Sequence, residues 1–332
     1  MKQYDVYGLG NALVDIEYEV TPEQLQALGI DKGVMTLVDE ARQAKVVSRL
    51  NGAERNKASG GSAANTIIAV SQFGGRSFYS CRVADDEFGH FYVDDLIHGG
   101  VITNIHPARM GSGVTGKCLV FVTPDADRTM NTYLGVSAEL SKDEVDESGI
   151  EESRYLYLEG YLVTGEATRA ATVYAREVAR ETGTKVALSL SDPNMVKFFK
   201  DGLLEMIGDG VDLLFANEQE ALGMTGADNL NDAVDQLRSM ADEVVVTLGA
   251  KGACICNSDG LVEIPPVKVK PVDTVGAGDM FAGAYLYGIT HDMSRQQAGN
   301  LAAAAAAKLV TSFGPRLKPE ETRALLNDFL KN

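Results

Sequence analysis

The sequence has few positive charges for its length. Its 332 residues include 30 lysines and arginines against 47 aspartates and glutamates, which gives a formal net charge of −17 at pH 7. Such a charge repels the phosphates of nucleic acids and the head groups of anionic lipids. The sequence therefore predicts no nucleic-acid partner and no membrane-surface role. Any phosphate must be bound by a local arrangement of groups.

Long apolar segments and clustered cysteines are also missing. No apolar run reaches about 18 residues without a charge or a glycine, the length that a membrane-spanning helix needs. Residues 1–6 have a strand pattern and lack the apolar segment of a secretory signal, so we expect a cytoplasmic protein. We expect the four scattered cysteines to be reduced and packed as small hydrophobic side chains. They are Cys81, Cys118, Cys254 and Cys256.

Strand and helix patterns alternate through most of the chain, which predicts an α/β domain with helices flanking a mostly parallel sheet. The clearest strands are residues 155–159, 185–190, 211–215 and 243–248. The clearest helices are residues 166–181 and 229–240. Strand patterns without helices between them predict a small accessory sheet. They lie at residues 14–20, 118–123 and 129–134. No repeat or long linker divides the chain, so we expect one domain over residues 1–332.

The strongest functional motif is DTVGAGD at residues 273–279, which an apolar helical pattern follows. Its glycines favour a tight turn whose backbone N–H groups can converge on an anion, and the helix that follows adds the positive end of its dipole. A carboxylate at the rim, Asp279, would lie beside a transferring phosphoryl group and could accept the proton of a hydroxyl. The alternative is that Asp279 only caps the helix.

Two segments offer polar groups that suit a sugar. Gly60 and Gly61 open a predicted helix that ends near residue 73, and they let a ligand lie against the backbone. Asn65, one turn into that helix, can direct its amide to the same place. Asn11 and Asp15 follow the first strand pattern and provide an amide and a carboxylate, which suit vicinal hydroxyls. The alternative for both segments is an exposed turn.

Two glycine motifs look like nucleotide-binding sequences but stand in the wrong context. Gly8 and Gly10 are followed by leucine at position 13, where a dinucleotide fingerprint needs its third glycine. Residues 111–118 (GSGVTGKC) have P-loop spacing, but cysteine replaces the magnesium-binding serine or threonine. A strand pattern follows them, whereas a P-loop opens a helix. We therefore expect a strand of the accessory sheet there.

Two more segments lie at the ends of predicted strands, where α/β sheets usually bind ligands. Asn217 and Glu220 could hold hydrated magnesium near phosphate oxygens, although Asn-x-x-Glu before a helix also forms a capping box. Thr247, Gly249 and Gly252 lie between two strand patterns and could approach the phosphates of a nucleotide. A plain hairpin connection explains the same three residues.

Taken together, these segments resemble the ribokinase (PfkB carbohydrate kinase) family over nearly the whole chain. Residues 60–65 are similar to the first family signature and residues 273–279 to the second. The resemblance implies a ribokinase-like three-layer α/β/α domain with a mostly parallel central sheet. It also implies a small β-sheet lid formed by strands around residues 14–20, 33–38 and 115–135. The implied activity is transfer of the γ-phosphoryl group from magnesium ATP to an alcohol group.

The resemblance also assigns roles to single residues. It makes Asp279 the catalytic base, beside an anion hole formed by the backbone of Gly276, Ala277 and Gly278. The implied substrate contacts are Asn11, Asp15, Gly60, Gly61 and Asn65. The implied ATP contacts are Asn217, Thr247, Gly249 and Gly252, with magnesium held near Glu220 through water. Asp273 and the carbonyl of Val275 correspond to a monovalent-cation loop, so K⁺ is an implied activator. Ala303 stands where relatives are often polar near the adenine, and Asn300 is the candidate contact one turn earlier.

The acceptor follows from finer features of the resemblance. The spacing of Asn11 and Asp15 is more similar to adenosine kinases than to ribokinases or fructokinases, and Arg128 and Asn131 fall in the lid segment where those enzymes differ. A ribonucleoside, adenosine first, is the predicted acceptor, and a free sugar or sugar acid such as ribose, fructose or 2-keto-3-deoxygluconate is the alternative. A third hypothesis is a protein that only senses such ligands, which has no need of Asp279 and its glycine turn. Relatives occur as monomers and as homodimers paired through the lid, and both remain open.

Overall fold

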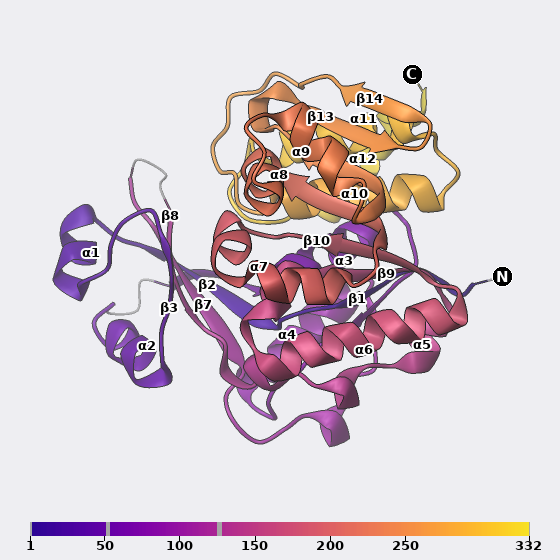
Figure 1. Ribbon diagram of the computed structural model, residues 1–332. Helices are drawn as coiled ribbons and strands as arrows, with labels where there is room; N and C mark the ends of the chain where they lie inside the picture. Colours follow the sequence, from indigo (N-terminus) through magenta and orange to yellow (C-terminus); the bar gives the residue numbers. More distant parts are fainter. Residues whose placement is uncertain (1, 51–53, 125–127, 332) are drawn as a thin grey trace.

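The larger of two β-sheets forms the centre of the computed structural model, which describes residues 2–50, 54–124 and 128–331 (Figure 1). Its strands are β1 (Tyr4–Leu9), β5 (Ser77–Ser80), β6 (Ile102–Thr103), β9 (Ser153–Glu159), β10 (Lys185–Ser189), β11 (Val211–Asn217), β12 (Ala241–Thr247), β13 (Ala253–Asn257) and β14 (Gly260–Ile264). They lie in the order β14-β13-β12-β11-β10-β9-β1-β5-β6. All pairs from β12 to β6 are parallel, and β13 and β14 continue the sheet antiparallel.

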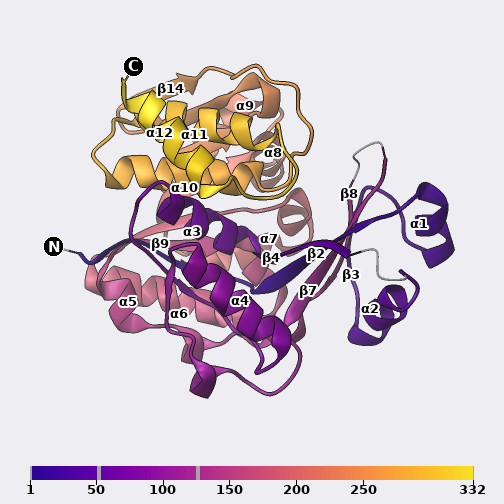
Figure 2. The ribbon, with the colours of Figure 1, turned by 180° about the vertical axis from the view of Figure 1, so that it is seen from behind.

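Helices cover both faces of this sheet, because parallel strands as apolar as β11 need cover on each side (Figures 1 and 2). One face carries α3 (Ser62–Gln72), α4 (Glu87–His98), α10 (Ala277–Thr290), α11 (Arg295–Leu309) and α12 (Pro319–Lys331). The other carries α5 (Glu147–Glu151), α6 (Glu166–Thr182), α7 (Pro193–Ile207), α8 (Glu218–Thr225) and α9 (Leu230–Leu237). Within the described ranges, no helix combines the length and apolar character that a bilayer crossing requires.

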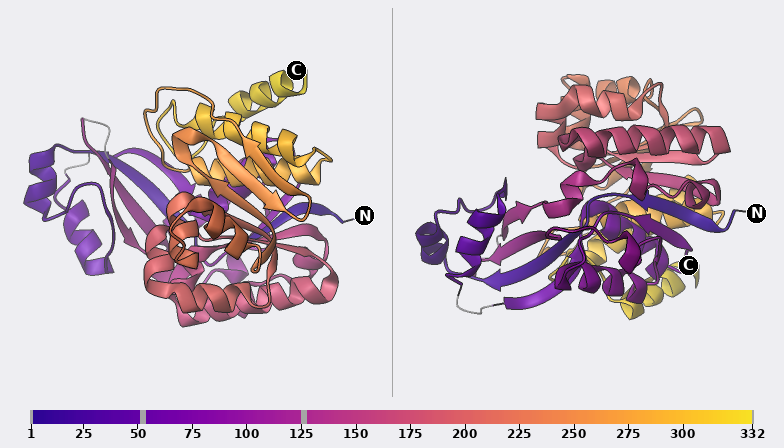
Figure 3. Two further views of the ribbon diagram at one scale, coloured as in Figure 1. Left: turned by 45° about the horizontal axis from the view of Figure 1, so that its top comes forward. Right: turned by 90° about the horizontal axis from the view of Figure 1, so that it is seen from below.

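The smaller sheet, which we call the accessory sheet, projects from one side of the larger one (Figure 3). Its strands lie in the order β3 (Met35–Leu37), β8 (Arg128–Tyr133), β7 (Gly116–Val122), β2 (Leu13–Glu19) and β4 (Glu54–Gly60). Helices α1 (Pro22–Leu28) and α2 (Glu40–Val47) lie beside it, on the side away from the larger sheet (Figure 1). Burial alternates along β2. One face of the sheet is therefore packed, and the other presents Leu13, Asp15 and Glu17.

The clearest predicted strands and helices are all present, with small shifts at their ends. Residues 116–122 form strand β7, which excludes the P-loop. A Cβ atom at Gly8 would lie 2.4 Å from Ile67, and one at Gly10 would lie 2.6 Å from Ala63, so these glycines let α3 pack closely on β1. Strand β4 was not predicted, because its sequence ERNKASG has no apolar alternation. All four cysteines are buried and free of disulfides, as predicted.

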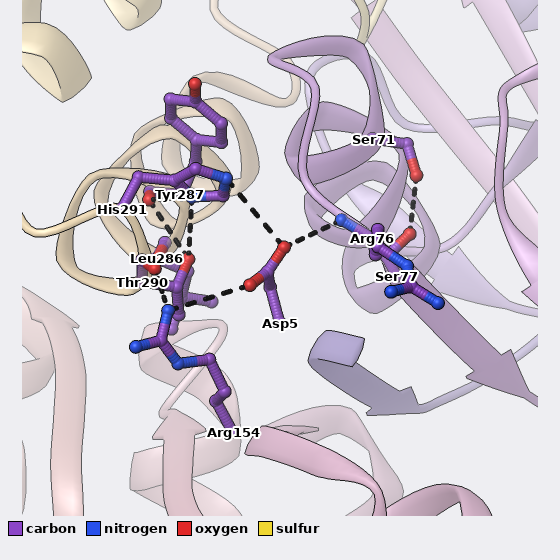
Figure 4. A network of polar contacts seen from close by, with 9 residues as sticks. All are labelled: Asp5, Ser71, Arg76, Ser77, Arg154, Leu286, Tyr287, Thr290 and His291. Carbon is purple, nitrogen blue, oxygen red and sulfur yellow. Dashed lines mark hydrogen bonds and ion pairs between the residues drawn. The ribbon is translucent and has the colours of Figure 1, made fainter. Parts of the chain in front are cut away.

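Charged side chains hold the C-terminal end of α10 against β1 (Figure 4). Asp5 in β1 accepts a hydrogen bond from the backbone N–H of Arg76 at 2.8 Å, and its carboxylate lies 3.8 Å from Arg154 and 3.9 Å from His291. Arg154 also donates to the carbonyl of Thr290, at the end of α10. The guanidinium of Arg154 at this position suits the negative end of the helix dipole. The network therefore fixes the helix whose other end begins within the DTVGAGD motif.

We expect Asp5→Ala to lower the free energy of unfolding by about 0.5–1.5 kcal/mol, because the N–H of Arg76 would lose its protein acceptor. The turnover number should be unchanged, since Asp5 lies at the opposite end of α10 from Asp279. Urea unfolding and a kinase assay measure the two quantities.

The matched control is Asp328→Ala, which removes an exposed pairing with Lys331 and should change stability by less than about 0.5 kcal/mol. If the two variants are equally stable, the network in Figure 4 does not hold α10.

Candidate active site

Five neighbouring parallel strands each bring a polar residue to the same edge of the larger sheet. Asn11 follows β1, while Glu159, Ser189, Asn217 and Thr247 end β9, β10, β11 and β12. Cross-strand pairing aligns Glu159 with Ser189, and Asn217 with Thr247. All five residues line one cavity of about 480 Å³. The cavity therefore lies at the carboxyl edge of the sheet, where α/β proteins bind ligands.

Three other segments complete the walls of this cavity. The start of α3 contributes Gly61, Ser62 and Asn65, and the loop into α10 contributes residues 274–279. The inner face of the accessory sheet covers one side with Leu13, Asp15, Met35, Leu37, Cys118, Met130 and Thr132. Residues from the predicted sugar segments, the strand ends and the DTVGAGD loop thus meet in one place.

Asp279 is in the first turn of α10, but its side chain is directed at α3. Its carboxylate accepts hydrogen bonds from Ser62 Oγ at 2.6 Å and from Asn65 Nδ2 at 3.2 Å. Burial raises the pKa of Asp279 to about 6, and the two hydrogen bonds limit the rise because they stabilise the charged form. The N-cap of α10 is Gly276. Asp279 therefore does not cap the helix, and it lines the cavity as a carboxylate that is mostly ionised at neutral pH.

The turn before α10 leaves backbone donors at the cavity. Gly276 has a φ of 75°, and no side chain caps the helix. A Cβ atom at Gly276 would lie 2.4 Å from the carbonyl oxygen of Pro315, so only glycine fits there. The N–H of Ala277 donates to the carbonyl of Thr274 at 3.3 Å. The N–H groups of Gly278 and Asp279 are therefore the best candidates to bind an anion, as expected at a helix N-terminus.

Gly60 and Gly61 make room for the other residues of the sugar segments. A Cβ atom at Gly60, the last residue of β4, would lie 2.3 Å from the carboxylate of Asp15. Gly61 has a φ of 101°, and its Cβ atom would lie 2.4 Å from the carbonyl oxygen of Asn11. Gly61 lines the cavity with Asn11, Asp15 and Asn65. The paired glycines thus allow the accessory sheet, β1 and α3 to meet closely at the site.

Glu159 belongs to the site, although the motifs did not point to it. One carboxylate oxygen accepts the backbone N–H and the Nδ2 of Asn11 at 2.7 and 2.8 Å, and the other accepts the N–H of Ala63 at 2.8 Å. Burial raises the pKa of Glu159 to about 7. The residue ties the start of α3 to the end of β1. A charged residue at the end of the apolar strand pattern of residues 155–159 was the available signal.

Four carboxylates with raised pKa values surround the cavity. Burial raises the pKa of Asp15, Glu159 and Glu220 to about 7 and that of Asp279 to about 6. The charge of Asp279 also raises the pKa of Asp15 and of Glu159. An anionic ligand in such a cavity needs cations with it.

Asn217 and Glu220 form the capping box that the sequence allowed. Glu220 accepts the backbone N–H of Asn217 at 2.9 Å and its Nδ2 at 2.6 Å, while the N–H of Glu220 donates to Asn217 Oδ1 at 2.9 Å. Among the described residues, no group of three or more histidines, cysteines, aspartates or glutamates could hold a metal. The pair fits magnesium that keeps its waters and binds phosphate oxygens, because Mg²⁺ rarely uses an all-protein cage.

The predicted monovalent-cation loop contains a buried ion pair. Asp273 accepts the N–H groups of Val275 at 3.1 Å and of Gly314 at 2.8 Å, and it lies 2.6 Å from the guanidinium of Arg128. Two unit charges 4 Å apart repel by about 4 kcal/mol at an effective dielectric constant near 20. A potassium ion at Asp273 would meet this repulsion from Arg128. The residues present therefore do not fit a K⁺ site.

Three of the predicted nucleotide-binding residues are not among those that line the cavity. Gly249 and Gly252 flank the turn between β12 and β13 and have φ values of 58° and 96°. A Cβ atom at Gly252 would lie 2.1 Å from the carbonyl oxygen of Ile264, so packing alone explains why a glycine stands at this position. Asn300 in α11 accepts a hydrogen bond from Gln296 at 3.2 Å. The nucleotide contacts of all three stay predictions.

Comparison with known proteins decides the family. The family described as pfkB family carbohydrate kinase matches residues 27–323. The chain belongs to the pfkB family. A probable sugar kinase of Rhizobium etli CFN 42 is 32% identical and has a TM-score of 0.90, over 99% of this chain and 100% of its own. The adenosine kinase of Sinorhizobium meliloti is 34% identical with a TM-score of 0.89, over 98% and 99%. A probable fructokinase of Arabidopsis thaliana is 32% identical over 71% of this chain and 74% of its own.

Membership of the pfkB family and the likeness to these structures confirm the predicted ribokinase-like α/β fold. The pfkB protein is a phosphotransferase with a hydroxyl acceptor, and its family uses ATP with magnesium. The similar proteins are a nucleoside kinase and sugar kinases by name. Either class of acceptor is consistent with them.

Proposed function

We propose that this pfkB kinase transfers the γ-phosphoryl group of ATP to a primary hydroxyl of a ribonucleoside, with adenosine as the leading acceptor. The observation that supports the proposal is that the cavity wall around Asp279 has a polar part and an apolar part. Polar side chains suited to a ribose lie beside this carboxylate, and apolar side chains suited to a nucleobase lie on the accessory sheet.

The polar part has hydrogen-bonding capacity left for a ligand. Asn65 Oδ1 is buried and has no hydrogen-bond partner within the described residues, although Nδ2 of the same side chain donates to Asp279. Buried polar atoms are rarely left unpaired, so a ligand hydroxyl is the natural donor here. Asn11 and Asp15 add an amide and a carboxylate to the same wall. A ribose with hydroxyls that donate and accept would satisfy all three.

The apolar part is larger than a sugar requires. Leu13, Met35, Leu37, Met130 and Leu134 all line the cavity, and Met35 and Leu37 are 40% and 52% exposed. Covering apolar surface stabilises a complex by about 25 cal/mol for each Å². A nucleobase can cover these side chains, whereas a free sugar would leave them in water. The adenosine kinase of Sinorhizobium meliloti, 34% identical over nearly the whole chain, supports the same acceptor.

The chemistry of the proposal is in-line transfer with Asp279 as general base. Asp279 accepts the proton of the acceptor hydroxyl, and Ser62 and Asn65 hold its carboxylate in position. The N–H groups of Gly278 and Asp279 stabilise charge on the transferring phosphoryl group. Glu220, with Asn217, would hold hydrated magnesium, which supplies positive charge beside the phosphates when bound. The accessory sheet excludes water, which otherwise competes as acceptor.

A free sugar is the second candidate, because fructokinases are among the similar proteins. The deciding experiment measures magnesium-dependent ADP release with adenosine, other ribonucleosides, ribose, fructose and 2-keto-3-deoxygluconate, and identifies each product by mass. We expect kcat/KM for the preferred nucleoside to exceed that for any free sugar by at least about 10²-fold, the order of one good apolar pocket. A larger kcat/KM for fructose or for the sugar acid would refute the proposal.

A variant on the apolar wall tests the assignment of the nucleobase. We expect Leu37→Ala to raise KM for the nucleoside by about tenfold with little change in kcat, because burial of one such side chain contributes about 1.5–3 kcal/mol. The matched control is Val47→Ala on α2, which is 40% exposed and does not line the cavity. Equal KM values in the two variants would remove Leu37 from the acceptor site.

A further inference from the structure

We propose that the guanidinium group of Arg128 takes the place of a monovalent cation beside the anion-binding loop, and that the accessory sheet carries this charge into position. The inference rests on phosphoryl transfer at residues 273–279, as proposed above, but it holds for any acceptor. It makes the activity of this kinase independent of K⁺.

Arg128 connects the accessory sheet to the loop that precedes α10. It belongs to β8, and its Nη2 lies 2.6 Å from Oδ2 of Asp273. Its Nη1 lies 3.1 Å from a carboxylate oxygen of Glu17, on β2 of the same sheet. The side chains of Arg128 and Asp273 are 6% and 2% exposed. A pair buried to this degree is stable only while both partners are present, because either charge alone would be left in a medium that solvates it poorly.

The position of Asp273 makes its charge important for the loop. One carboxylate oxygen accepts the N–H of Val275, and the other accepts the N–H of Gly314. Pro315 is the next residue after Gly314, and its carbonyl packs against Gly276 at the N-terminus of α10. Asp273 therefore joins the two chain segments that shape the anion-binding turn. A cation at this carboxylate balances its buried negative charge and helps to keep both N–H groups bound.

A guanidinium meets this need differently from a potassium ion. It is always charged and donates in fixed directions, whereas potassium requires several oxygen ligands and must be taken from solution. Asp273 already has a cation at 2.6 Å and two N–H donors, so it offers no position that a second cation could share without repulsion. The K⁺ activation that the sequence motif implies is thus replaced by a side chain of the same protein.

The charge belongs to the accessory sheet and not to the body of the protein. Because Glu17 holds Arg128 on the sheet, the guanidinium moves with the sheet as a unit. A second contact also joins the accessory sheet to the body of the protein. Arg316 donates to the carbonyl of Ser59 in β4 and pairs with Asp95 at 3.0 Å. Any outward movement of the accessory sheet would separate Asp273 from its cation. The anion-binding turn is therefore complete only while the sheet covers the cavity.

The test compares kcat in potassium, sodium and tetramethylammonium salts for the wild type, Arg128→Gln and Arg128→Lys. The wild type should vary by less than about twofold between salts. Arg128→Gln should lose at least about tenfold in tetramethylammonium and recover most of that loss in potassium, in the range of ordinary site couplings. Arg128→Lys, which keeps the charge, should stay insensitive to potassium. Activation of the wild type by potassium overturns the proposal.

Two more outcomes for Arg128→Gln would refute the proposal. If Arg128→Gln is equally slow in every salt, a monovalent cation does not replace the guanidinium and the proposal is wrong. If Arg128→Gln is as fast as the wild type without potassium, no cation is needed and the proposal is wrong again. Circular dichroism confirms that each variant is folded before its kinetics are interpreted, and Arg128→Lys carries the comparison if Arg128→Gln does not fold.

A binding measurement separates this inference from the proposed acceptor. Thallium-205 NMR detects a bound monovalent cation without any turnover. We expect no thallium bound at Asp273 in the wild type and a bound signal in Arg128→Gln that Asp273→Asn abolishes. Thallium binding by the wild type that Asp273→Asn removes would overturn the inference, whatever hydroxyl compound the kinase phosphorylates.

Discussion

Replacing Asp279 by asparagine is expected to lower kcat by about 10²–10⁴-fold, the contribution of a well-placed general base. The amide cannot take the hydroxyl proton, but it has nearly the shape of the carboxylate and can still accept from Ser62. KM values should therefore change much less than kcat. ADP release with saturating ATP and acceptor measures the loss. Asp328→Asn, an exposed substitution on α12, is the control, and near-normal turnover of Asp279→Asn would remove Asp279 from the mechanism.

The pH dependence of the same variant adds a second readout. Burial raises the pKa of Asp279 from 3.8 to about 6, so kcat/KM of the wild type should fall as the pH drops below about 6. Asp15, Glu159 and Glu220 have pKa values near 7, so the part of the pH profile that the asparagine variant lacks belongs to Asp279.

The raised pKa of Asp279 also affects stability. The folded protein binds the proton of Asp279 more tightly than the unfolded chain does, and the resulting stabilisation is lost as the pH rises through 6. At neutral pH the variant should be at least as stable as the wild type.

Gly276→Ala should lower kcat by about 10²-fold or more, the cost of losing one preorganised donor at developing charge. Its φ of 75° strains any other residue, and the added Cβ atom would lie 2.4 Å from the carbonyl oxygen of Pro315. The turn must shift, and the N–H groups of Gly278 and Asp279 shift with it.

Gly226→Ala is the matched control for this substitution. Gly226 has a φ of 76° at the C-cap of α8, and nothing lies within 4 Å of its Cβ position. It carries the same backbone strain without the clash and lies outside the cavity lining. Kinetics and urea unfolding of both variants separate the two effects. Equal losses of kcat would show that strain alone, and not the contact with Pro315, governs the turn.

Local pattern was sufficient to predict the α/β architecture, because periodicity reports which faces of helices and strands are buried. The strands predicted at residues 155–159, 211–215 and 243–248 are present, and their ends differ from the prediction by at most two residues. Strand β4 was missed because its polar sequence forms a strand only through pairing with β2. Tertiary pairing overrode local preference there.

The features of the active site also fall into two groups, those that local sequence predicts and those that depend on tertiary contacts. The turn at residues 273–279 could be found from sequence, because its glycines are needed for local backbone shape. The pairing of Asp273 with Arg128 could not, since it depends on how the accessory sheet lies against the body. The role of Glu159 likewise depends on strand order, which places it between Asn11 and the start of α3. Contacts between distant parts of the chain produce no motif of fixed residue spacing that could be recognised in the sequence.

The acidic wall of the cavity also influences how a catalytic cycle ends. A nucleoside enters without charge and leaves with a phosphate that carries about 1.5–2 negative charges near neutral pH. Asp15, Glu159, Glu220 and Asp279 surround the place it must leave, and each has a pKa raised to about 6 or 7. Asp15 and Asp279 can accept hydrogen bonds from hydroxyls of the neutral acceptor, but the negative charge of the wall repels the phosphorylated product. The acidic wall that admits the neutral acceptor therefore favours release of the phosphorylated product.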